Sequence, residues 1–249
     1  MGREVKISSS PKRIISTVPS QTELLHYLHL EDEVLGVTKF CTHPSNWQKS
    51  KERIGGTKNL NITKINSLKP DLIIGNKEEN TKEDISELEK IAPVWMSDVN
   101  SFSDALDMIK KIGNITNRTK TASSLISNLI QLQKETIKKE LNVIYLIWNE
   151  PMMCVGKDTF IDSMLSECGF INIIKKSRYP EISLQEINSL NPDLLLLSTE
   201  PYPFGNKHLT HFKTHLPNTK AMLVDGEMFS WYGSRLEFSF AYFKEIFKI

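Results

Sequence analysis

Two stretches decide the fold of this chain: INSLKPDLIIG at residues 65–75 and INSLNPDLLLL at residues 187–197. Seven of their first eight letters agree, and the two stretches lie about half a chain apart. Solenoid repeats recur every ~20–50 residues, so this interval is too long for a solenoid. The repetition therefore predicts two related lobes within the 249 residues.

Each stretch is expected at a corner where a helix ends and a buried strand begins. The residue before a proline disfavours the α region, so each INSL helix should end just before Pro70 or Pro192. Around the corners, short apolar runs alternate with helical patterns, which is typical of a parallel sheet covered by helices. Strands are predicted at 13–18, 33–38, 71–75 and 93–97 in the first half, and at 142–148, 194–198 and 221–226 in the second.

The predicted fold class is α/β, with two Rossmann-like lobes, each a parallel sheet flanked by helices, joined by one long α-helix. We expect an N-terminal lobe at residues 1–102, a linking helical segment at 103–141 and a C-terminal lobe with a terminal helix at 142–249. Residues 119–141 contain no proline or glycine and have apolar residues at helical spacing. A helix of that length would extend roughly 30 Å from one lobe to the other.

Sequence signals also predict where helices begin and end. Two S-x-x-E patterns, Ser20 with Glu23 and Ser183 with Glu186, predict capping boxes. Gly169 is predicted to end the helix that follows Thr159. The helix N-termini at Ser20 and Thr159 would direct backbone N–H groups toward anionic or carbonyl groups of a ligand, or would equally serve as caps and nothing more.

Composition and charge exclude several classes of protein. Hydrophobic residues make up 39% and charged residues 24%, with a formal net charge of +1. A nucleic-acid partner is not expected, because such binders need a broad basic surface. The longest apolar runs are far shorter than the ~20 residues that span a bilayer. Three cysteines without a CxxC pair, Cys41, Cys154 and Cys168, predict free thiols and favour a reducing compartment.

Four longer stretches resemble one known family. They are PKRIISTVPSQTELLHYLHLEDEVLGVT (11–38), WNEPMMCVGKDTFIDSMLSECGFINII (148–174), SRYPEISLQEINSLNPDLLL (177–196) and DGEMFSWYGSRL (225–236). Together they resemble the helical-backbone (class III) periplasmic binding proteins of ABC importers for cobalamin, iron-siderophores and haem. The WNEP and KSRYPEIS patterns are most similar to the cobalamin-binding branch.

The resemblance implies a bilobal protein that binds a small-molecule metal chelate in the cleft between its lobes, as the substrate-binding component of an ABC-type uptake system. It implies a cobalamin-like corrinoid first, a ferric siderophore or haem next, no intrinsic cofactor, no catalysis and a monomer. The alternative is a cytoplasmic carrier, sensor or enzyme on the same scaffold that is not coupled to a permease.

Candidate ligand-binding residues follow from the rule that ligands of open α/β sheets lie outside the carboxyl ends of the strands. Tryptophans and other aromatic residues in these loops suit a planar macrocycle, which needs broad apolar contact and a few polar groups. The predicted set is Pro19, Ser20, Phe40, Trp47, Gly56, Asn76, Trp148, Glu150, Met153, Tyr202, Phe204 and Trp231.

Metal-ligating and catalytic patterns are weak. His208, His211 and His215 share a helical spacing, but three histidines without a carboxylate more often form a solvated face. Cys41 and His43 lack a further ligand pair. No nucleophile or phosphate-binding motif is present, and Glu150 and Asp158 are loop carboxylates. We therefore predict no metal site and no catalytic residue.

The chain departs from the family at two positions. In transport-coupled members, a surface glutamate lies seven residues before each corner proline and pairs with a permease arginine. The equivalent positions here are Thr63 and Gln185. Their neighbours are Lys64 and Glu186. The missing charges weaken the expectation of ordinary permease docking.

The start of the chain has no 7–15-residue apolar stretch and no cleavage site, so it is not interpreted as a secretory signal. We expect a periplasmic or cell-surface protein if a leader has been removed, and a cytoplasmic protein if Met1 is the native start.

Overall fold

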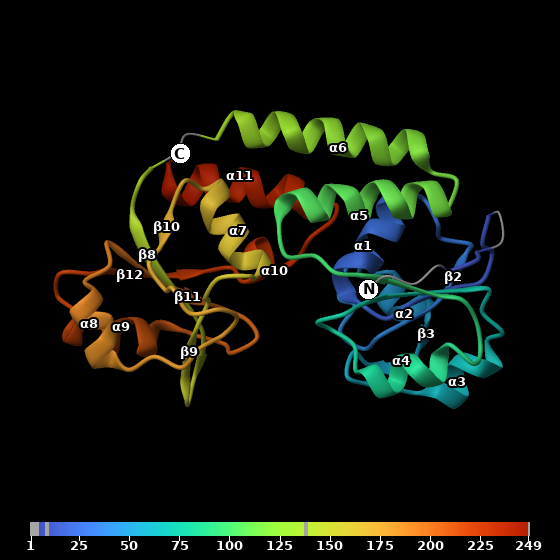
Figure 1. Ribbon diagram of the computed structural model, residues 1–249, viewed down its shortest axis with the longest axis horizontal. Coiled ribbons are helices and arrows are strands. Elements are labelled where there is room, and N and C mark those ends of the chain that lie inside the picture. Colours follow the sequence, from blue (N-terminus) through green and yellow to red (C-terminus); the bar gives the residue numbers. More distant parts are fainter. Residues whose placement is uncertain (1–4, 8–9, 137–138, 249) are drawn as a thin grey trace. The chain divides into compact units, whose positions relative to one another are not determined.

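The computed structural model describes residues 5–7, 10–136 and 139–248, and the chain divides into two compact units. Unit 1 comprises Met1–Val99, Ser103–Ile130 and Trp231–Leu236, and unit 2 comprises Asn100–Phe102, Gln131–Ser230 and Glu237–Ile249. Each unit contains a parallel sheet flanked by helices (Figure 1), which confirms the predicted fold class. Among the described residues, no helix is long and apolar enough to cross a membrane.

The sheet of unit 1 has the strand order β3-β2-β1-β6-β7, and all neighbouring strands run parallel. Its strands are β1 (Ile14–Ser16), β2 (Val34–Val37), β3 (Glu52–Arg53), β6 (Leu72–Asn76) and β7 (Val94–Ser97). A separate hairpin pairs β4 (Gly55–Gly56) with β5 (Asn59–Leu60). The helices are α1 (Pro19–Tyr27), α2 (Trp47–Ser50), α3 (Ile62–Ser67), α4 (Lys82–Leu88), most of α5 (Phe102–Ile115) and the first part of α6 (Thr119–Lys134).

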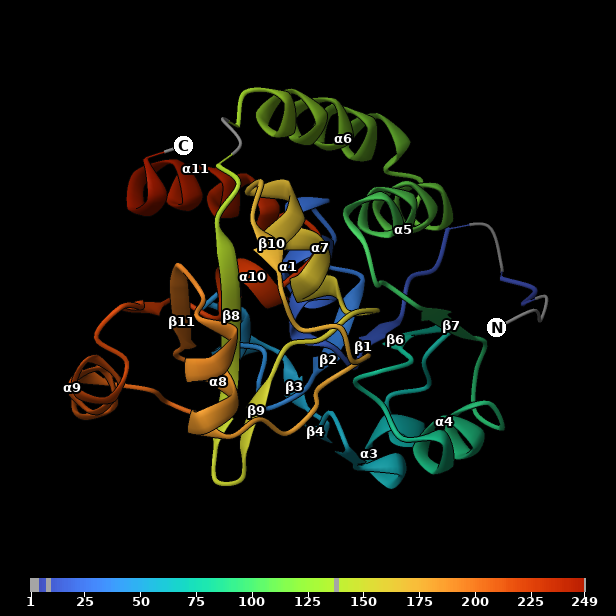
Figure 2. The same cartoon turned by 60° about the vertical axis from the view of Figure 1, so that its left-hand side comes forward.

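The sheet of unit 2 has the order β10-β8-β11-β12, so β8 lies between β10 and β11 (Figure 2). Its strands are β8 (Asn142–Asn149), β9 (Met152–Cys154), β10 (Ile171–Asn172), β11 (Leu194–Ser198) and β12 (Lys220–Val224), and only β9 pairs antiparallel, with β8. The helices are α7 (Phe160–Glu167), α8 (Leu184–Leu190), α9 (Asn206–His215), α10 (Glu227–Ser230) and nearly all of α11 (Leu236–Phe247). With the edge strand β3 and the antiparallel β9 set aside, both sheets have the order second-first-third-fourth strand, β2-β1-β6-β7 in unit 1 and β10-β8-β11-β12 in unit 2, which explains the repeated sequence.

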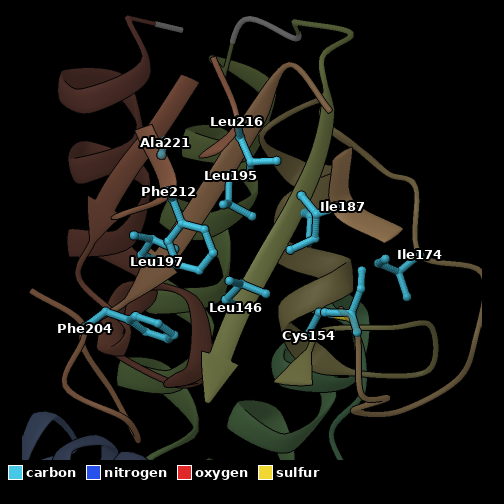
Figure 3. Packing of buried hydrophobic residues seen from close by; sticks show 12 residues of the cluster. Leu146, Cys154, Ile174, Ile187, Leu195, Leu197, Phe204, Phe212, Leu216 and Ala221 are labelled. Carbon is cyan, nitrogen blue, oxygen red and sulfur yellow. The ribbon is translucent and has the colours of Figure 1, made fainter. Parts of the chain in front are cut away.

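Equivalent helices cover the same face of each sheet. In unit 1, α3 and α4 lie side by side and bury apolar residues against β1 and β6 (Figure 1). In unit 2, α8 and α9 take this place, and their side chains converge on those of β8 and β11 (Figure 3). The residues that meet on this face of unit 2 include Leu146, Leu195, Leu197, Ile187, Phe212 and Leu216. The leucine of each PDL, Leu72 or Leu194, is therefore buried, and so is the isoleucine of each INSL helix, Ile65 or Ile187, as the pattern predicted.

The two INSL helices end at the predicted corners through a left-handed residue. Lys69 has φ 48° and Asn191 has φ 44°, and a proline follows each. A helix ended in this way cannot continue, because the proline has no N–H to donate and restricts the residue before it.

The aspartate that follows each corner proline connects the corner to the chain where the first strand of its unit begins, just before β1 in unit 1 and at the first residue of β8 in unit 2. The Asp71 carboxylate accepts hydrogen bonds from the backbone N–H groups of Lys12, at 2.7 Å, and Arg13, at 2.9 Å. The Asp193 carboxylate accepts one from Asn142 at 2.7 Å. Each copy of the repeated stretch therefore contains an aspartate whose hydrogen bonds the sequence pattern did not predict.

The linking segment 103–141 is two helices rather than one long helix. At the end of α5, Asn117 has φ 57°, and the N–H of Arg118 donates to the carbonyl of Gly113 at 2.7 Å. This pattern is a Schellman motif with asparagine at the left-handed position, and it ends α5. Helix α6 begins at Thr119 as predicted but ends at Lys134, short of 141. Residues 137–138 lie outside the described residues.

The segment Trp231–Leu236 also departs from the predicted boundaries, because it belongs to unit 1 and not to the C-terminal lobe. Arg235 explains this placement. Its Nε donates to Glu23 Oε2 at 2.9 Å and its Nη2 donates to Oε1 at 2.8 Å. The two side chains are only 8% and 14% exposed, so a largely buried ion pair anchors this segment to α1.

One of the two predicted capping boxes is wrong. Helix α1 begins at Pro19, its N-cap is Val18, and no side chain caps it. Proline is favoured at the first helical position, which places Ser20 inside the helix and leaves Glu23 to pair with Arg235. The second box, Ser183 with Glu186 at the start of α8, is confirmed in both directions.

Candidate functional site

The strand order defines one candidate binding edge in each unit. Ligands of open parallel sheets bind outside the carboxyl ends of the strands, at the point where the strand order reverses. In unit 1 this point lies between β1 and β6, and in unit 2 it lies between β8 and β11. We call these positions the switch point of unit 1 and the switch point of unit 2.

Aromatic side chains dominate the switch point of unit 2. Trp148, near the end of β8, is 39% exposed, and its ring centroid lies 5.6 Å from that of Tyr202, which follows β11. The indole N–H donates to the carbonyl of Glu150 at 3.0 Å, so the turn between β8 and β9 orients the ring. Two predicted site residues from distant parts of the sequence are thus brought together, with an apolar face open to solvent.

The other predicted residues of unit 2 surround this pair. Met153 is half-buried on β9, where it pairs with Trp148 across the hairpin, and Glu150 is exposed in the turn. Phe204 is buried in the core, 4.8 Å from the ring of Tyr202. Phe204 therefore packs against and supports Tyr202, and its own contact with a ligand stays a prediction.

A pocket of about 480 Å³ lies beside the aromatic pair of unit 2. His208 forms part of its wall, where its Nδ1 accepts a hydrogen bond from the Gly205 N–H at 3.0 Å and its Nε2 lies 3.1 Å from the Tyr202 hydroxyl. Burial, followed by the nearby Lys207 charge, lowers the pKa of His208, which favours a neutral imidazole. The lining residues are Asn149, Glu150, Met152, Leu184, Tyr202, Lys207, His208, His211 and Phe212.

Hydrogen bonds between side chains and backbone dominate the switch point of unit 1. The Asn80 amide donates to the carbonyl of Thr57 at 2.9 Å, and its oxygen accepts from the Thr17 hydroxyl and the Asn76 N–H, both at 2.9 Å. These contacts connect the end of β1 to the turn that follows β6. Residues 76–80 are therefore held in one conformation above the switch point.

Asn76, which was predicted to contact a ligand, forms hydrogen bonds within the turn after β6. Its oxygen accepts from the backbone N–H groups of Glu78, at 2.8 Å, and Glu79, at 3.2 Å, and its amide donates to Ser97 at 3.0 Å. The residue is buried. Asn76 thus shapes the turn, and its contact with a ligand stays a prediction.

Sequence reasoning missed three residues at the switch point of unit 1: Glu79, Ser97 and Tyr232. Tyr232 is buried beside the hydroxyls of Ser20 and Ser97, and burial raises the pKa of its phenol, with the Glu79 carboxylate acting in the same direction. Glu79 is half-buried, and burial raises the pKa of its carboxyl group. The adjacent Trp231 was in the predicted set, whereas Tyr232 carried no signal of its own that set it apart in the sequence.

Phe40 and Trp47, two aromatic residues of unit 1 that were predicted to contact a ligand, differ in how far they are exposed. Phe40 is 51% exposed, and its ring would lie 3.2 Å from a Cβ placed on Gly56. The glycine therefore allows the ring to lie close over the hairpin backbone. Trp47 is only 2% exposed and packs edge-on against His26. Trp47 is therefore a core residue of unit 1, and its contact with a ligand stays a prediction.

Trp231 belongs to unit 1 because it lies in the segment Trp231–Leu236, which Arg235 anchors to α1. Its ring lies 4.8 Å from the guanidinium carbon of Arg235 and 5.7 Å from the ring of His43, and it is 9% exposed. Arg235 thus contacts both Glu23 and the indole, so the ion pair also orients Trp231. Of the remaining predicted residues, Pro19 is half-buried and Ser20 is buried in the first turn of α1.

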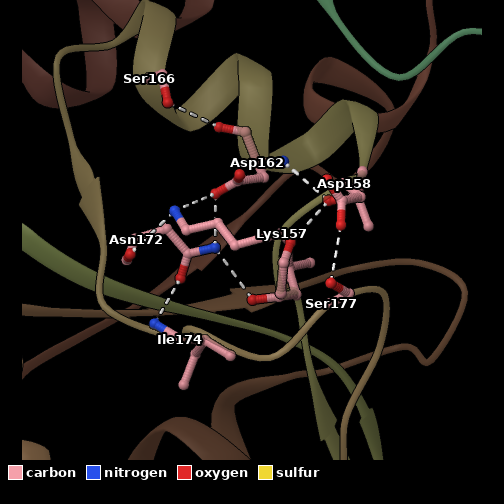
Figure 4. A network of polar contacts seen from close by, with 10 residues as sticks. Lys157, Asp158, Asp162, Ser166, Asn172, Ile174 and Ser177 are labelled. Carbon is pink, nitrogen blue, oxygen red and sulfur yellow. Dashed lines mark hydrogen bonds and ion pairs between the residues drawn. The ribbon is translucent and has the colours of Figure 1, made fainter.

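The N-terminus of α7 was predicted to face a ligand, but its own side chains satisfy it. The Thr159 hydroxyl accepts from the Asp162 N–H at 3.1 Å and donates to the carbonyl of Gly156 at 3.1 Å. The Asp162 carboxylate in turn accepts from Asn172 at 2.8 Å and Lys157 at 3.2 Å (Figure 4). This network fixes α7 against β10 and carries a structural role.

The described residues contain no group of three or more His, Cys, Asp or Glu side chains arranged to hold a metal ion. His211 and His215 stack with ring centroids 4.3 Å apart, whereas His208 contacts Tyr202. All three cysteines are free and buried. Burial raises the pKa of Cys41 and Cys168 and raises that of Cys154 to about 11, so these thiols are unreactive.

The two positions expected to carry docking glutamates are equivalent in structure. Thr63 and Gln185 are exposed, and each is the second residue of its helix, α3 or α8. Lys64 pairs with Glu52 at 2.6 Å. The Glu186 carboxylate accepts hydrogen bonds from Ser183, which lower its pKa, so Glu186 belongs to the cap.

Two parallel-sheet units with one strand order, each presenting its candidate ligand-binding residues at the carboxyl edge, define a two-unit α/β binding protein. The chain belongs to the periplasmic binding protein family, whose sequence pattern matches residues 14–221. This confirms the resemblance found in the sequence.

Individual relatives extend the comparison. The chain is 31% identical over 208 residues to the uncharacterized ABC transporter substrate-binding lipoprotein YvrC of Bacillus subtilis, covering 78% of this chain and 66% of that protein. It is 23% identical over 206 residues to a vitamin B12-binding protein of Vibrio cholerae, covering 80% and 74%. The crystal structure of the periplasmic vitamin B12 binding protein BtuF of Vibrio cholerae superposes with a TM-score of 0.81 at 21% identity, covering 96% of this chain and 99% of that chain, which shows the shared fold.

Proposed function

We propose that this protein is the substrate-binding component of an ABC-type uptake system, and that it binds a metal chelate without catalysing a reaction. A cobalamin-like corrinoid is the first candidate ligand, and a ferric siderophore or haem is the next. Membership of the periplasmic binding protein family over residues 14–221 carries this proposal. The names of the relatives, a substrate-binding lipoprotein and a vitamin B12-binding protein, support it and favour a location outside the cytoplasm.

The carboxyl edges of the two sheets fit such a ligand chemically. A planar macrocycle needs broad aromatic contact, which the exposed ring of Trp148 and the half-buried ring of Tyr202 offer in unit 2 and the exposed ring of Phe40 offers in unit 1. Polar side chains at the switch point of unit 1, among them Ser20 and Ser97, would orient the ligand. The proposed ligand-binding set is therefore Phe40, Trp148, Glu150, Met153, Tyr202 and Trp231, with Pro19, Ser20 and Gly56 nearby in sequence or structure.

Ligand titration tests the proposal directly. The purified protein is titrated with cyanocobalamin, hemin and a ferric siderophore, and visible absorbance and tryptophan fluorescence are followed. Binding of any of these chelates should quench Trp148 and shift the ligand spectrum. Absence of a response to all three would overturn the proposal.

We also propose an ABC permease as the partner of a monomeric protein, docked through uncharged contacts at Thr63 and Gln185. Both residues are exposed at equivalent places on α3 and α8, which supports a shared docking role. Docking without ion pairs depends weakly on salt, so its affinity should change little between low and physiological ionic strength. A steep loss of affinity with added salt would contradict this mode of docking.

A further inference from the structure

We propose that Glu79 binds the ligand at the switch point of unit 1, and that it selects ligands with N–H donors on their rim over ligands with carboxylates there. This inference rests on the proposed function, because it assigns one more residue to the same candidate binding edge. Pattern reasoning did not single out Glu79.

The backbone around Glu79 is fixed at the right place. Its N–H donates to the Asn76 oxygen at 3.2 Å, directly after β6. Asn80 then connects this turn to Thr17 at the end of β1 through a hydrogen bond of 2.9 Å. Strands β1 and β6 are the neighbours between which the strand order reverses. Glu79 is therefore presented by a rigid turn at the position where open α/β sheets bind ligands.

The Glu79 carboxylate is partly shielded from water and poorly supplied with hydrogen-bond donors. It is half-buried, and among the described residues it accepts no hydrogen bond from another side chain or from the backbone. The charged neighbours are Lys58, whose ammonium donates to the Glu78 carbonyl at 2.8 Å, and the Glu78 carboxylate itself. Burial raises the pKa of Glu79, with Glu78 adding to the effect and Lys58 opposing it.

Such a group stabilises the free protein little, because a carboxylate removed from water without hydrogen-bond donors carries a desolvation cost. A ligand that supplies donors would relieve that cost. Carboxyl groups with environments of this kind are typical of binding and catalytic sites. The unmet acceptors of Glu79 therefore point to a ligand group with N–H donors, such as a primary amide or an ammonium.

The same carboxylate acts against a second class of ligand. Corrinoids carry primary amides around the ring, whereas haem carries two propionate carboxylates. A propionate placed beside Glu79 would meet a like charge at a half-buried position, where solvent screens it less than at an exposed one, which costs affinity. Glu79 should therefore favour the amide-rimmed macrocycle over the carboxylate-rimmed one.

The test compares two probes on two variants. Glu79→Gln removes the charge and keeps the shape of the side chain, so it should remain folded. Glu83→Gln, an exposed residue in the first turn of α4 of the same unit, makes the same change in net charge elsewhere. Affinities for cyanocobalamin and hemin are measured for both variants and for the unmodified protein by fluorescence quenching, with thermal melting as a check on folding.

We expect Glu79→Gln to weaken cyanocobalamin binding about tenfold, because a charge-assisted hydrogen bond becomes a neutral one, and to strengthen hemin binding. Glu83→Gln should change neither affinity. If the unmodified protein binds cyanocobalamin and Glu79→Gln binds it equally well, or if the unmodified protein prefers hemin, the inference is overturned while the proposed function stands. Failure of the unmodified protein to bind any chelate overturns both.

Discussion

The two corners of this protein are nearly identical, whereas the two switch points differ. Both corners use the INSL helix, a left-handed residue, a proline and an aspartate that binds the first strand of the unit. The switch point of unit 1 is polar, with Asn76, Asn80 and Glu79, and that of unit 2 is aromatic, with Trp148 and Tyr202. The repeated letters specify the scaffold, and the residues proposed to bind the ligand lie where the repeat breaks down.

The largest expected effect concerns the segment that unit 1 takes from the end of the chain. Replacing Arg235 with methionine leaves Glu23 as a buried, unpaired carboxylate, and breaking such a pair typically costs about 3–5 kcal/mol. The midpoint of thermal unfolding should fall by roughly 10 °C, since each kcal/mol shifts a chain of this size by about 2–4 °C.

Lys244→Met is the matched control, because Lys244 pairs with Glu135 at an exposed site in unit 2. Exposed pairs are worth ~0–1 kcal/mol, so this variant should melt close to the unmodified protein. Equal losses for the two variants would show that the Arg235 pair does not anchor unit 1.

The second prediction tests whether the two corners are equally strong. Asp71→Ala removes two charge-assisted hydrogen bonds and Asp193→Ala removes one. Since such bonds are worth about 1.5–3 kcal/mol before allowance for exposure, we expect losses of roughly 3 and 1.5 kcal/mol in urea unfolding. A larger loss for Asp193→Ala would reverse the order of the two corners.

Much of the scaffold could be predicted from sequence because local patterns carry it. The corners, the strand runs, the Ser183 capping box and the end of the helix at Gly169, with φ 75°, all depend on residues close in the chain. The Ser20 capping box failed because Pro19, only one residue earlier, competes to start the same helix.

The candidate site was harder to predict because long-range contacts build it. Trp231 and Tyr232 join unit 1 through Arg235, a partner more than two hundred residues from Glu23, and no local pattern reports such a contact. Burial also separates residues that look alike in sequence: Trp47 is in the core, and Trp148 is exposed. No sequence motif marks Glu79, because only its surroundings in the folded protein distinguish it from other glutamates.

The third prediction tests the aromatic character of the switch point of unit 2. Trp148→Ala removes the exposed indole that faces Tyr202, which should weaken binding of cyanocobalamin about 20-fold, corresponding to roughly 2 kcal/mol of lost apolar and aromatic contact. Phe238→Ala, a 59% exposed aromatic residue on α11, should leave the affinity unchanged. Unchanged affinity in Trp148→Ala would remove this ring from the ligand-binding set.

The fourth prediction concerns the helix caps. Ser183→Ala deletes the side chain that caps α8, which typically costs ~1 kcal/mol. Ser189→Ala, an exposed position later in the same helix, should change stability by less than about 0.5 kcal/mol. Similar losses at both positions in urea unfolding would indicate a general effect of helix composition rather than of the cap.

The smallest expected effect is the pH dependence contributed by Glu79, which sharpens the contrast between the two switch points. Burial raises the folded-state pKa of this carboxyl above its ordinary value of 4.5. As pH rises from 4.5 to the folded pKa, the unfolded chain has lost the proton that the folded protein still holds, so stability falls across this window and stays lower above it. Glu79→Gln removes that loss. The variant should therefore be more stable than the unmodified protein at pH 8 and equally stable at pH 4.

Urea unfolding at both pH values measures this difference, with Glu83→Gln as the control. Glu83 lies in the first turn of α4, where a negative charge is favourable, so its removal should give no gain at pH 8. A stability gain for Glu79→Gln that is the same at pH 4 and pH 8 would mean that its charge is not the cause. A gain confined to high pH would mean that unit 1 keeps a destabilising carboxylate at its switch point, which is expected of a group retained for binding and not for folding.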